Sequence, residues 1–307
     1  TDILVEGLKR LEYRGYDSAG VAVLSADGLI HDCKRVGKVA NVQQGLKDFP
    51  IKGALGIAHT RWATHGKPSE ANAHPHFSGD HGIAVVHNGI IENHQQLRAS
   101  LQAKGYVFES QTDTETVVHL TDDCWRAGGD LYAAVCRAIT QLDGAYALAV
   151  IAANEADKMI VAREGSPLVI GVGYGENFVA SDPLALRMIT DKFIYLQEGD
   201  VGVVTLKDVA VFDRDGVPQT RAIEQVDELH DSGDKGEYRH FMLKEIYEQP
   251  RVFEQTLQGR IGKDYLVEEC FGAAAREKLD VTKAVQIVAC GTSFHAGMIA
   301  RYWIEEF

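Results

Sequence analysis

Short apolar runs separated by turns fill residues 145–212, and this density of strands leaves few folds open to the chain. The runs are AYALAVI, KMIVA, PLVIGVG, FVAS, FIYL, VGVVTL and VAVF. Turn sequences such as Gly173-Tyr174-Gly175 separate them. Many short strands with tight turns are typical of antiparallel sheets. Because helical patterns precede these strands, the sequence predicts an α+β fold with large antiparallel sheets.

The composition of the 307 residues, 45% hydrophobic and 24% charged, is typical of globular proteins. The 31 basic and 44 acidic residues give a net charge of −13, which disfavours nucleic acid or an anionic membrane as a partner. No apolar run is long enough for a membrane span, and no signal peptide is visible. The five cysteines are scattered without CxxC spacing, which suits reduced thiols and predicts a cytoplasmic protein.

Residues 56–89 place polar side chains after two apolar runs. Gly56-Ile57-Ala58 is expected to end a buried strand, and Ile83–Val86 is expected to be a second strand that ends in His87-Asn88-Gly89. The donors after the first strand are His59, Thr60, Arg61, Thr64 and His65. Two strands that end in donor-rich turns place those turns at one edge of a sheet, where sites tend to occur.

The Asn88-Gly89 pair has two interpretations. Between two strands, Asn-Gly usually forms a type I′ hairpin turn. The residues after Ile91 have helical spacing with Asn93 as a cap, which favours a turn between a strand and a helix. Such a turn would leave the Asn amide and the Gly N–H free to form an oxyanion hole for acyl transfer. The residues alone leave the plain turn and the oxyanion hole both open.

Arg61 is the best candidate for binding a carboxylate, because a guanidinium group matches a carboxylate with two parallel hydrogen bonds. The alternative is a surface arginine. Trp62 could pack in the core or cover a ligand, and Gly66 and Pro68 would allow this loop to move.

Thr112-Asp113-Thr114-Glu115 predicts a capping box at the start of a helix. Asp113 could at the same time face the pocket and pair with a substrate ammonium group.

Histidines are dense between residues 59 and 87, so a metal site is an alternative. The histidines concerned are His59, His65, His74, His76, His81 and His87. No carboxylate or cysteine keeps ligand spacing with them, and we predict neither a metal nor a cofactor. His74 could equally be a structural histidine.

The segments LEYRGYDSAG, HTRWATHG, NAHPH, HNGIIENH and TDTE together resemble the glutaminase domain of the glutamine–fructose-6-phosphate aminotransferase family. The resemblance continues through GDKGEYRHFMLKEIYEQP to CGTS and covers nearly the whole chain. It implies a four-layer αββα sandwich of the N-terminal-nucleophile hydrolase type. It also implies a class II glutamine amidotransferase domain in residues 1–227, a linker and helix in 228–250, and the start of an α/β sugar isomerase domain in 251–307.

The resemblance also implies roles for individual residues. Arg61 and Asp113 would hold the α-carboxylate and the α-amino group of glutamine, and Asn88 and Gly89 would form the oxyanion hole. Other residues implied near glutamine are Arg14, Trp62, Thr64, His65 and His74. Thr292 and Ser293 would touch the phosphate of a sugar.

Thr1 is excluded as a nucleophile because it opens an amphipathic helix, where its hydroxyl is expected to cap the first turn. Members of the family begin with Cys-Gly-Ile on a strand ahead of this helix, and that cysteine is the nucleophile. Cys33, Cys124 and Cys136 lie in ordinary strand or helix patterns and do not replace it. We therefore expect a fragment that is inactive by itself.

The C-terminal part is expected to begin with a polar linker, Asp227–Gly236, and a helix, Tyr238–Gln249, that stops at Pro250. Val285–Cys290 is expected to be a buried strand, followed by a turn and a helix. A strand, a Gly-hydroxyl turn and a helix N-terminus form a natural phosphate site.

The resemblance implies that the complete enzyme hydrolyses glutamine and transfers ammonia to fructose 6-phosphate, giving glucosamine 6-phosphate and glutamate. It also implies a homo-oligomer formed through the rest of the isomerase domain. Two alternatives are another class II amidotransferase with a different acceptor, and a non-enzymatic module that binds an amino acid as a sensor. KEIYEQP and CGTS favour the aminotransferase, because they belong to the acceptor half of that family.

Overall fold

The structure is a computed structural model that describes residues 1–62, 66–226, 237–257 and 275–306. The chain divides into two compact units, residues 1–233 and 234–307, which are described separately. The predicted linker, Asp227–Gly236, lies outside the described residues, and the predicted domain limits therefore stay a prediction.

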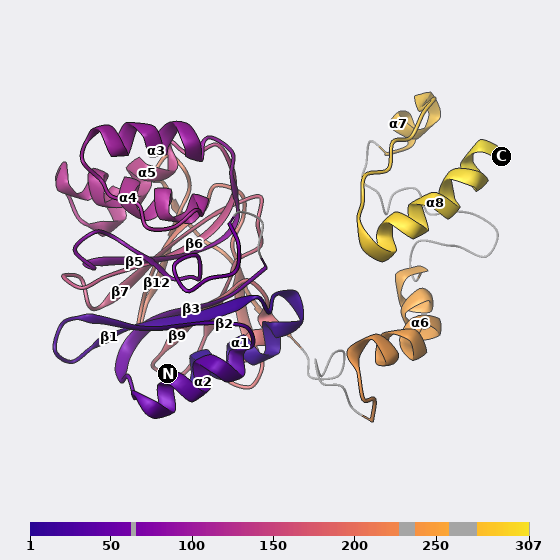
Figure 1. Cartoon of the computed structure of the whole chain (residues 1–307). Coiled ribbons are helices and arrows are strands. Elements are labelled where there is room, and N and C mark those ends of the chain that lie inside the picture. Colours follow the sequence, from indigo (N-terminus) through magenta and orange to yellow (C-terminus); the bar gives the residue numbers. More distant parts are fainter. Residues whose placement is uncertain (63–65, 227–236, 258–274, 307) are drawn as a thin grey trace. The chain divides into compact units, whose positions relative to one another are not determined.

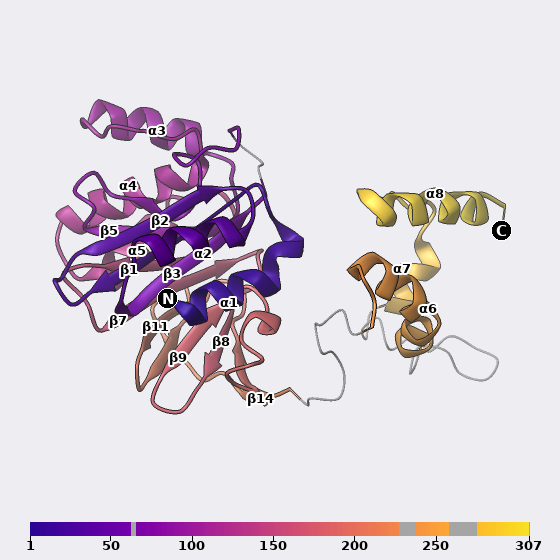
Figure 2. The ribbon, with the colours of Figure 1, turned by 60° about the horizontal axis from the view of Figure 1, so that its bottom comes forward.

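The first unit has four layers, in which two facing layers of sheet lie between two layers of helices (Figure 1). Helices α1 and α2 cover one outer face, and helices α3, α4 and α5 cover the other (Figure 2). Their bounds are α1 Asp2–Leu11, α2 Val39–Asp48, α3 His94–Ala103, α4 Asp113–Arg126 and α5 Leu131–Ile139. Two short 3₁₀ helices are η1 Glu12–Arg14 and η2 Pro183–Ala185.

One sheet layer contains a three-stranded sheet, β2-β1-β3, and a four-stranded sheet, β14-β10-β8-β9; the other is a seven-stranded sheet, β13-β12-β11-β7-β6-β5-β4. Neighbouring strands pair antiparallel, as the sequence predicts. The strands are β1 Ser18–Ser25, β2 Ile30–Val36, β3 Gly53–Arg61, β4 His76–Phe77, β5 Ile83–Ile91, β6 Gly144–Ala152, β7 Lys158–Glu164, β8 Val169–Val172, β9 Asn177–Ala180, β10 Lys192–Tyr195, β11 Val201–Thr205, β12 Val209–Phe212, β13 Pro218–Gln219 and β14 Ile223–Gln225.

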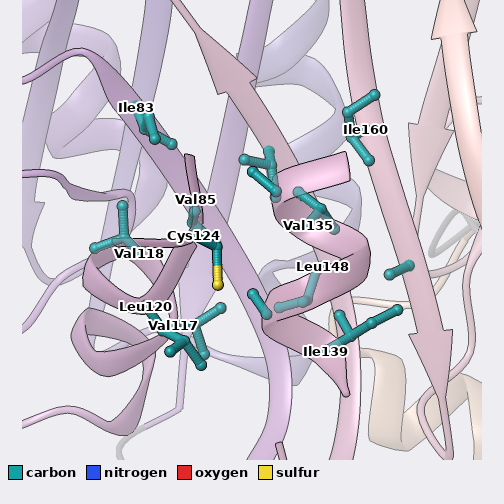
Figure 3. Packing of buried hydrophobic residues seen from close by; sticks show 14 of the residues in the cluster. Ile83, Val85, Val117, Val118, Leu120, Cys124, Val135, Ile139, Leu148 and Ile160 are labelled. Atoms are coloured by element: carbon teal, nitrogen blue, oxygen red, sulfur yellow. The ribbon is translucent and has the colours of Figure 1, made fainter. Parts of the chain in front are cut away.

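Strand β6 shows why the apolar runs are nearly continuous. Leu148 and Val150 point from one face of β6 into the core beneath α4 and α5, which Figure 3 shows around Leu148. Ala147 and Ala149 point from the other face into the core between the two sheet layers. A central strand covered on both faces needs apolar residues at every position, because successive side chains point to opposite faces.

Helix α1 begins after Thr1 as predicted, but the Thr1 hydroxyl makes no capping hydrogen bond. The Thr1 carbonyl instead accepts the first helical hydrogen bond from the Val5 N–H at 3.0 Å. The capping role predicted for the hydroxyl is therefore wrong, although the position of Thr1 is correct.

The second unit contains α6 (Phe241–Leu257), α7 (Ala275–Val281) and α8 (Gly291–Glu306). Helix α6 continues through Pro250, so the predicted stop is wrong. Proline removes one helical hydrogen bond and bends a helix, and it need not end it. Among the described helices of the chain, none is long and apolar enough to cross a membrane.

The strand predicted at Val285–Cys290 is not formed, and its residues are exposed. A strand needs neighbours to pair its N–H and C=O groups, and the second unit has no strand among its described residues. Helix α8 begins at Gly291, so Thr292 and Ser293 lie in its first turn instead of in a separate turn.

Candidate functional site

Strands β3 and β5 both run further than the apolar runs predict, and their polar ends meet between the two sheets. On β3, His59 and Arg61 lie on the same face as Ile57, which belongs to the core between the sheets. On β5, Asn88 lies on the same face as Val86, which belongs to the same core. His59 Nε2 and Asn88 Oδ1 are consequently 2.7 Å apart.

The prediction that Asn88-Gly89 forms a turn is wrong in both of its versions. The two residues lie inside β5 and pair with Ala147 and Tyr146 of β6. Gly89 has φ of +134°, and a β-carbon there would lie 1.9 Å from the carbonyl oxygen of Ala145. Only glycine fits this position, because an L side chain would be strained and would also overlap the neighbouring strand.

One edge of β5 carries a row of N–H groups. The N–H of His87 donates to His74 Nδ1 at 3.4 Å, and the N–H of Ile91 donates to Asp113 Oδ2 at 2.9 Å. Alternate N–H groups of a strand point the same way, so the N–H of Gly89 is directed toward this edge too. Gly89 and the Asn88 amide therefore place two donors next to each other at the polar end of β5.

Arg61 is buried, with 4% of its surface exposed, so the alternative of a surface arginine is wrong. Its Nη1 lies 3.7 Å from Asp17 Oδ1, and its Nη2 donates to the carbonyl of Gly66 at 3.0 Å. Trp62 has 60% of its surface exposed and packs edge-to-face against Tyr16, so it does not belong to the core.

Asp113 stands at the start of α4, where the helix dipole favours a carboxylate. Thr112 Oγ1 accepts from the N–H of Glu115 at 3.4 Å, which is half of the predicted capping box. The Glu115 carboxylate does not complete the box, because it accepts from the N–H groups of Glu109 and Ser110 at 2.6 and 2.7 Å. Asp113 is 5% exposed and directs its carboxylate at β5.

The buried histidines beside Asn88 are linked through Thr114. His74 Nε2 and His87 Nδ1 lie 3.4 and 3.0 Å from Thr114 Oγ1, and the His74 ring stacks on His59 at 4.2 Å. Because His74 Nδ1 accepts from a backbone N–H, a neutral His74 carries its proton on Nε2 and donates to Thr114. The Thr114 hydroxyl then donates to His87 Nδ1, and His87 Nε2 faces the carbonyl of Ala145 at 3.5 Å.

Burial keeps these imidazoles neutral. It lowers the pKa of His59 to about 4 and that of His76 to about 3. Burial also lowers the pKa of His74 well below its ordinary value, and neighbouring histidines lower it further. For His87, burial lowers the pKa and the nearby Asp113 carboxylate partly opposes that effect.

A cavity of about 610 Å³ lies along β3 and β9, beneath α1. The predicted site residues that line it are Arg14, Arg61, Trp62, His74, Asn88, Gly89 and Asp113. Arg14 reaches it from η1 and pairs with Asp182 at 3.5 Å. Thr64 and His65 lie outside the described residues, and Thr292 and Ser293 belong to the second unit.

The contacts of Asp17, His59 and Thr114 were not predicted from the sequence. Residues 57, 59 and 61 alternate on one face of β3, so a longer strand would have placed His59 beside Arg61 on the cavity side. Asp17 and Thr114 gave no such signal, because their partners are distant in the sequence. Among the described residues, no three His, Cys, Asp or Glu side chains are grouped as metal ligands.

Residues 59–188 match the sequence profile of the glutamine amidotransferase domain. Over 306 residues the chain is 58% identical to glutamine–fructose-6-phosphate aminotransferase [isomerizing] of Pseudomonas aeruginosa, which covers 100% of the chain and 50% of that relative. The Aliivibrio fischeri protein of the same name is 55% identical over 305 residues, covering 99% of the chain and 50% of the relative. The chain thus spans about half the length of the curated relatives it matches.

Among solved structures, the glutamine phosphoribosylpyrophosphate amidotransferase from B. subtilis, complexed with ADP and GMP, is 27% identical with a TM-score of 0.60. The match covers 69% of this chain and 46% of that one. This likeness agrees with the expected four-layer sandwich. The chain is therefore a relative of the glutamine–fructose-6-phosphate aminotransferases over its whole length, and it carries a glutamine amidotransferase domain with the N-terminal-nucleophile hydrolase fold.

Proposed function

We propose that the first unit binds glutamine and supports hydrolysis of its side-chain amide. The observation that carries the proposal is that Arg61, Asp113, Asn88 and Gly89, from three different elements, line one cavity. Arg61 provides a guanidinium group for the α-carboxylate, and Asp113 provides a carboxylate for the α-ammonium group. The Asn88 amide and the Gly89 N–H stabilise the oxyanion that forms at the side-chain amide.

We propose that an extended segment bearing the nucleophile occupies the cavity. The cavity follows β3 along its length and is bordered opposite by β9, so it offers two strand edges to a further strand. A segment antiparallel to β3 that leads into Thr1 would place its amino end beside Asn88. None of the described residues that line the cavity is a cysteine, which fits a nucleophile supplied by such a segment.

The proposed chemistry is acyl transfer to an N-terminal cysteine. The thiol sulfur attacks the side-chain carbon of glutamine while its proton passes through the α-amine to the leaving ammonia. The resulting thioester is hydrolysed by water, which gives glutamate and restores the thiol. The oxyanion formed in each step lies against the Asn88 and Gly89 donors.

For the complete protein we propose ammonia transfer to fructose 6-phosphate, because the relatives are named as glutamine–fructose-6-phosphate aminotransferases. Thr292 and Ser293, at the N-terminus of the 16-residue helix α8, would hold the sugar phosphate. A homo-oligomer in the cytoplasm belongs to the same proposal. An amidotransferase with another acceptor remains the second candidate, since residues 59–188 match the amidotransferase domain in general.

Calorimetric titration of the chain with L-glutamine tests the binding site. Arg61→Lys should lose about 2–3 kcal/mol of binding free energy, because an ammonium group cannot replace the paired hydrogen bonds. Arg35→Lys, on β2 and outside this cavity, is the matched control and should bind like the parent. Thermal unfolding of both variants checks the fold.

A second ligand distinguishes binding of the α-amino group from binding of the α-carboxylate. The analogue 4-carbamoylbutanoate lacks the α-amino group, so it should bind the parent chain more weakly than glutamine does. Asp113→Asn should weaken glutamine binding and leave analogue binding nearly unchanged. Equal affinity of the parent and Arg61→Lys for glutamine would remove the support for the proposed carboxylate site.

A further inference from the structure

We propose that His59 is a positioning residue that makes the amino group of the Asn88 carboxamide, and not its oxygen, point into the cavity. The contact between His59 Nε2 and Asn88 Oδ1, at 2.7 Å, is short and joins two strands of different sheets. If His59 donates, the carboxamide oxygen is fixed and the Nδ2 amino group is left for a ligand. The inference rests on the proposed function, because Nδ2 is the donor assigned there to the oxyanion.

The surroundings of the imidazole decide which nitrogen carries the proton. His59 Nδ1 is buried and has no hydrogen-bond partner among the described residues. A proton on Nδ1 would leave a buried N–H without an acceptor, which native structures avoid more strictly than an unpaired acceptor. A proton on Nε2 instead donates to Asn88 Oδ1, so the geometry assigns the Nε2–H form.

Burial first, and then neighbouring positive charge, keeps His59 in this neutral form. Its ring is stacked on His74 with an angle of 17° between the planes, and Arg61 lies two residues along the same face of β3. Burial lowers the pKa of His59 to about 4, although the Asn88 hydrogen bond partly opposes the shift. A neutral imidazole has one donor and one acceptor nitrogen. With the proton on Nε2, His59 can therefore bind only the oxygen of the Asn88 carboxamide.

The orientation matters because the carboxamide ends in an oxygen, which accepts hydrogen bonds, and an amino group, which donates them. Turned by 180°, Asn88 would present its oxygen to the cavity and repel the oxyanion that its amino group is proposed to stabilise. His59 thus acts on the oxyanion through Asn88.

Nitrogen NMR of the chain as it stands tests the tautomer directly. With ¹⁵N-labelled histidine at pH 7, His59 should show a protonated Nε2 and an unprotonated Nδ1. In His59→Phe, which keeps a ring for the stack on His74, the side-chain N–H₂ signals of Asn88 should shift. A protonated Nδ1 in the parent chain would overturn the inference.

Glutaminase kinetics of the complete enzyme test the consequence. His59→Phe should lower kcat about 10–100-fold with KM nearly unchanged, whereas His59→Gln, whose amide can still donate, should stay within about fivefold of the parent. Combined with Asn88→Ala, His59→Phe should cause no further loss, because both changes remove the same donor. Additive losses, or equal losses in the Gln and Phe variants, would overturn the inference.

The outcomes of these experiments distinguish a failure of the proposed function from a failure of the positioning role. An inactive complete enzyme would overturn the proposed function, and the NMR tautomer would then decide the role of His59 by itself. An active enzyme whose His59 carries its proton on Nδ1 would overturn the positioning role and leave glutamine hydrolysis standing.

Discussion

We predict that the ionised carboxylate of Glu115 stabilises the start of α4, where Asp113 lies. Its oxygens accept from the N–H of Glu109 at 2.6 Å and from the N–H and hydroxyl of Ser110 at 2.7 and 2.6 Å. Replacing it by glutamine keeps the size of the side chain but removes the charge. It also turns an amino group toward these donors, so at least one hydrogen bond must be lost.

The magnitude follows from the pKa of Glu115. Burial raises this pKa, but His119, Ser110 and the N–H of Glu109 outweigh burial and lower it to about 2, from an ordinary value of 4.5. His119 Nε2 is 3.7 Å away, so the bonds from Glu109 and Ser110 carry the larger share. Because one pKa unit corresponds to about 1.4 kcal/mol, the ionised carboxylate stabilises the fold by about 3 kcal/mol at pH 7.

The sign of the pH dependence is fixed by the lowered pKa. The stabilisation is fully present above about pH 4.5 and is lost as the pH falls toward about 2, where the folded state also takes up the proton. At pH 3 about 1.5 kcal/mol should remain. Glu115→Gln should therefore cost less at pH 3 than at pH 7.

Urea unfolding of the chain at both pH values measures this difference. Glu109→Gln, at an exposed neighbouring carboxylate, is the control and should change the unfolding free energy by less than about 0.5 kcal/mol. The same loss for Glu115→Gln at pH 3 and pH 7 would show that the stabilisation does not come from the ionised form.

Two other changes test the packing of the first unit by thermal unfolding. Gly89→Ala should lower the unfolding free energy by more than about 2 kcal/mol because of its φ of +134°. Gly79→Ala, in open space, should not, and equal effects would refute the argument. Arg221→Met leaves Asp200, 1% exposed, without its paired bonds at 2.7 and 2.8 Å, and should cost about 3–5 kcal/mol. Lys104→Met, in an exposed pair, should cost less than about 1 kcal/mol, and a loss as large as that of Arg221→Met would contradict this reasoning.

The large sheets could be predicted because burial on both faces leaves a local signal. Each apolar run between residues 145 and 212 contains a strand of the structure, from β6 to β12. The helices that carry Cys124 and Cys136 were predictable for a related reason, since their apolar residues pack into the core beside the seven-stranded sheet. Hydrophobic patterns of this kind depend only on which side chains are buried.

The polar ends of β3 and β5 could not be predicted from the same signal. Asn88-Gly89 has the composition of a turn, but nine residue pairs between β5 and β6 hold it in an extended conformation. Those partners lie more than 50 residues away in the sequence, so no local pattern reports them. The strand predicted at Val285–Cys290 was wrong for the opposite reason. The segment has the composition of a strand but lacks a partner strand among the described residues.

The charges of the site match a zwitterion. Arg61 supplies a positive group at the end of β3, with Asp17 at 3.7 Å, longer than a hydrogen bond. Asp113 supplies a negative group at the start of α4. The imidazoles around Asn88, among them His59 and His74, are neutral, so they add no charge of their own to the site. An α-amino acid carries one charge of each sign at a fixed separation, so the glutamine proposed above would extend its side chain toward Asn88. On that proposal, the burial that keeps the histidines neutral would also favour a zwitterionic ligand and leave the Asn88 carboxamide as the donor at the reacting amide.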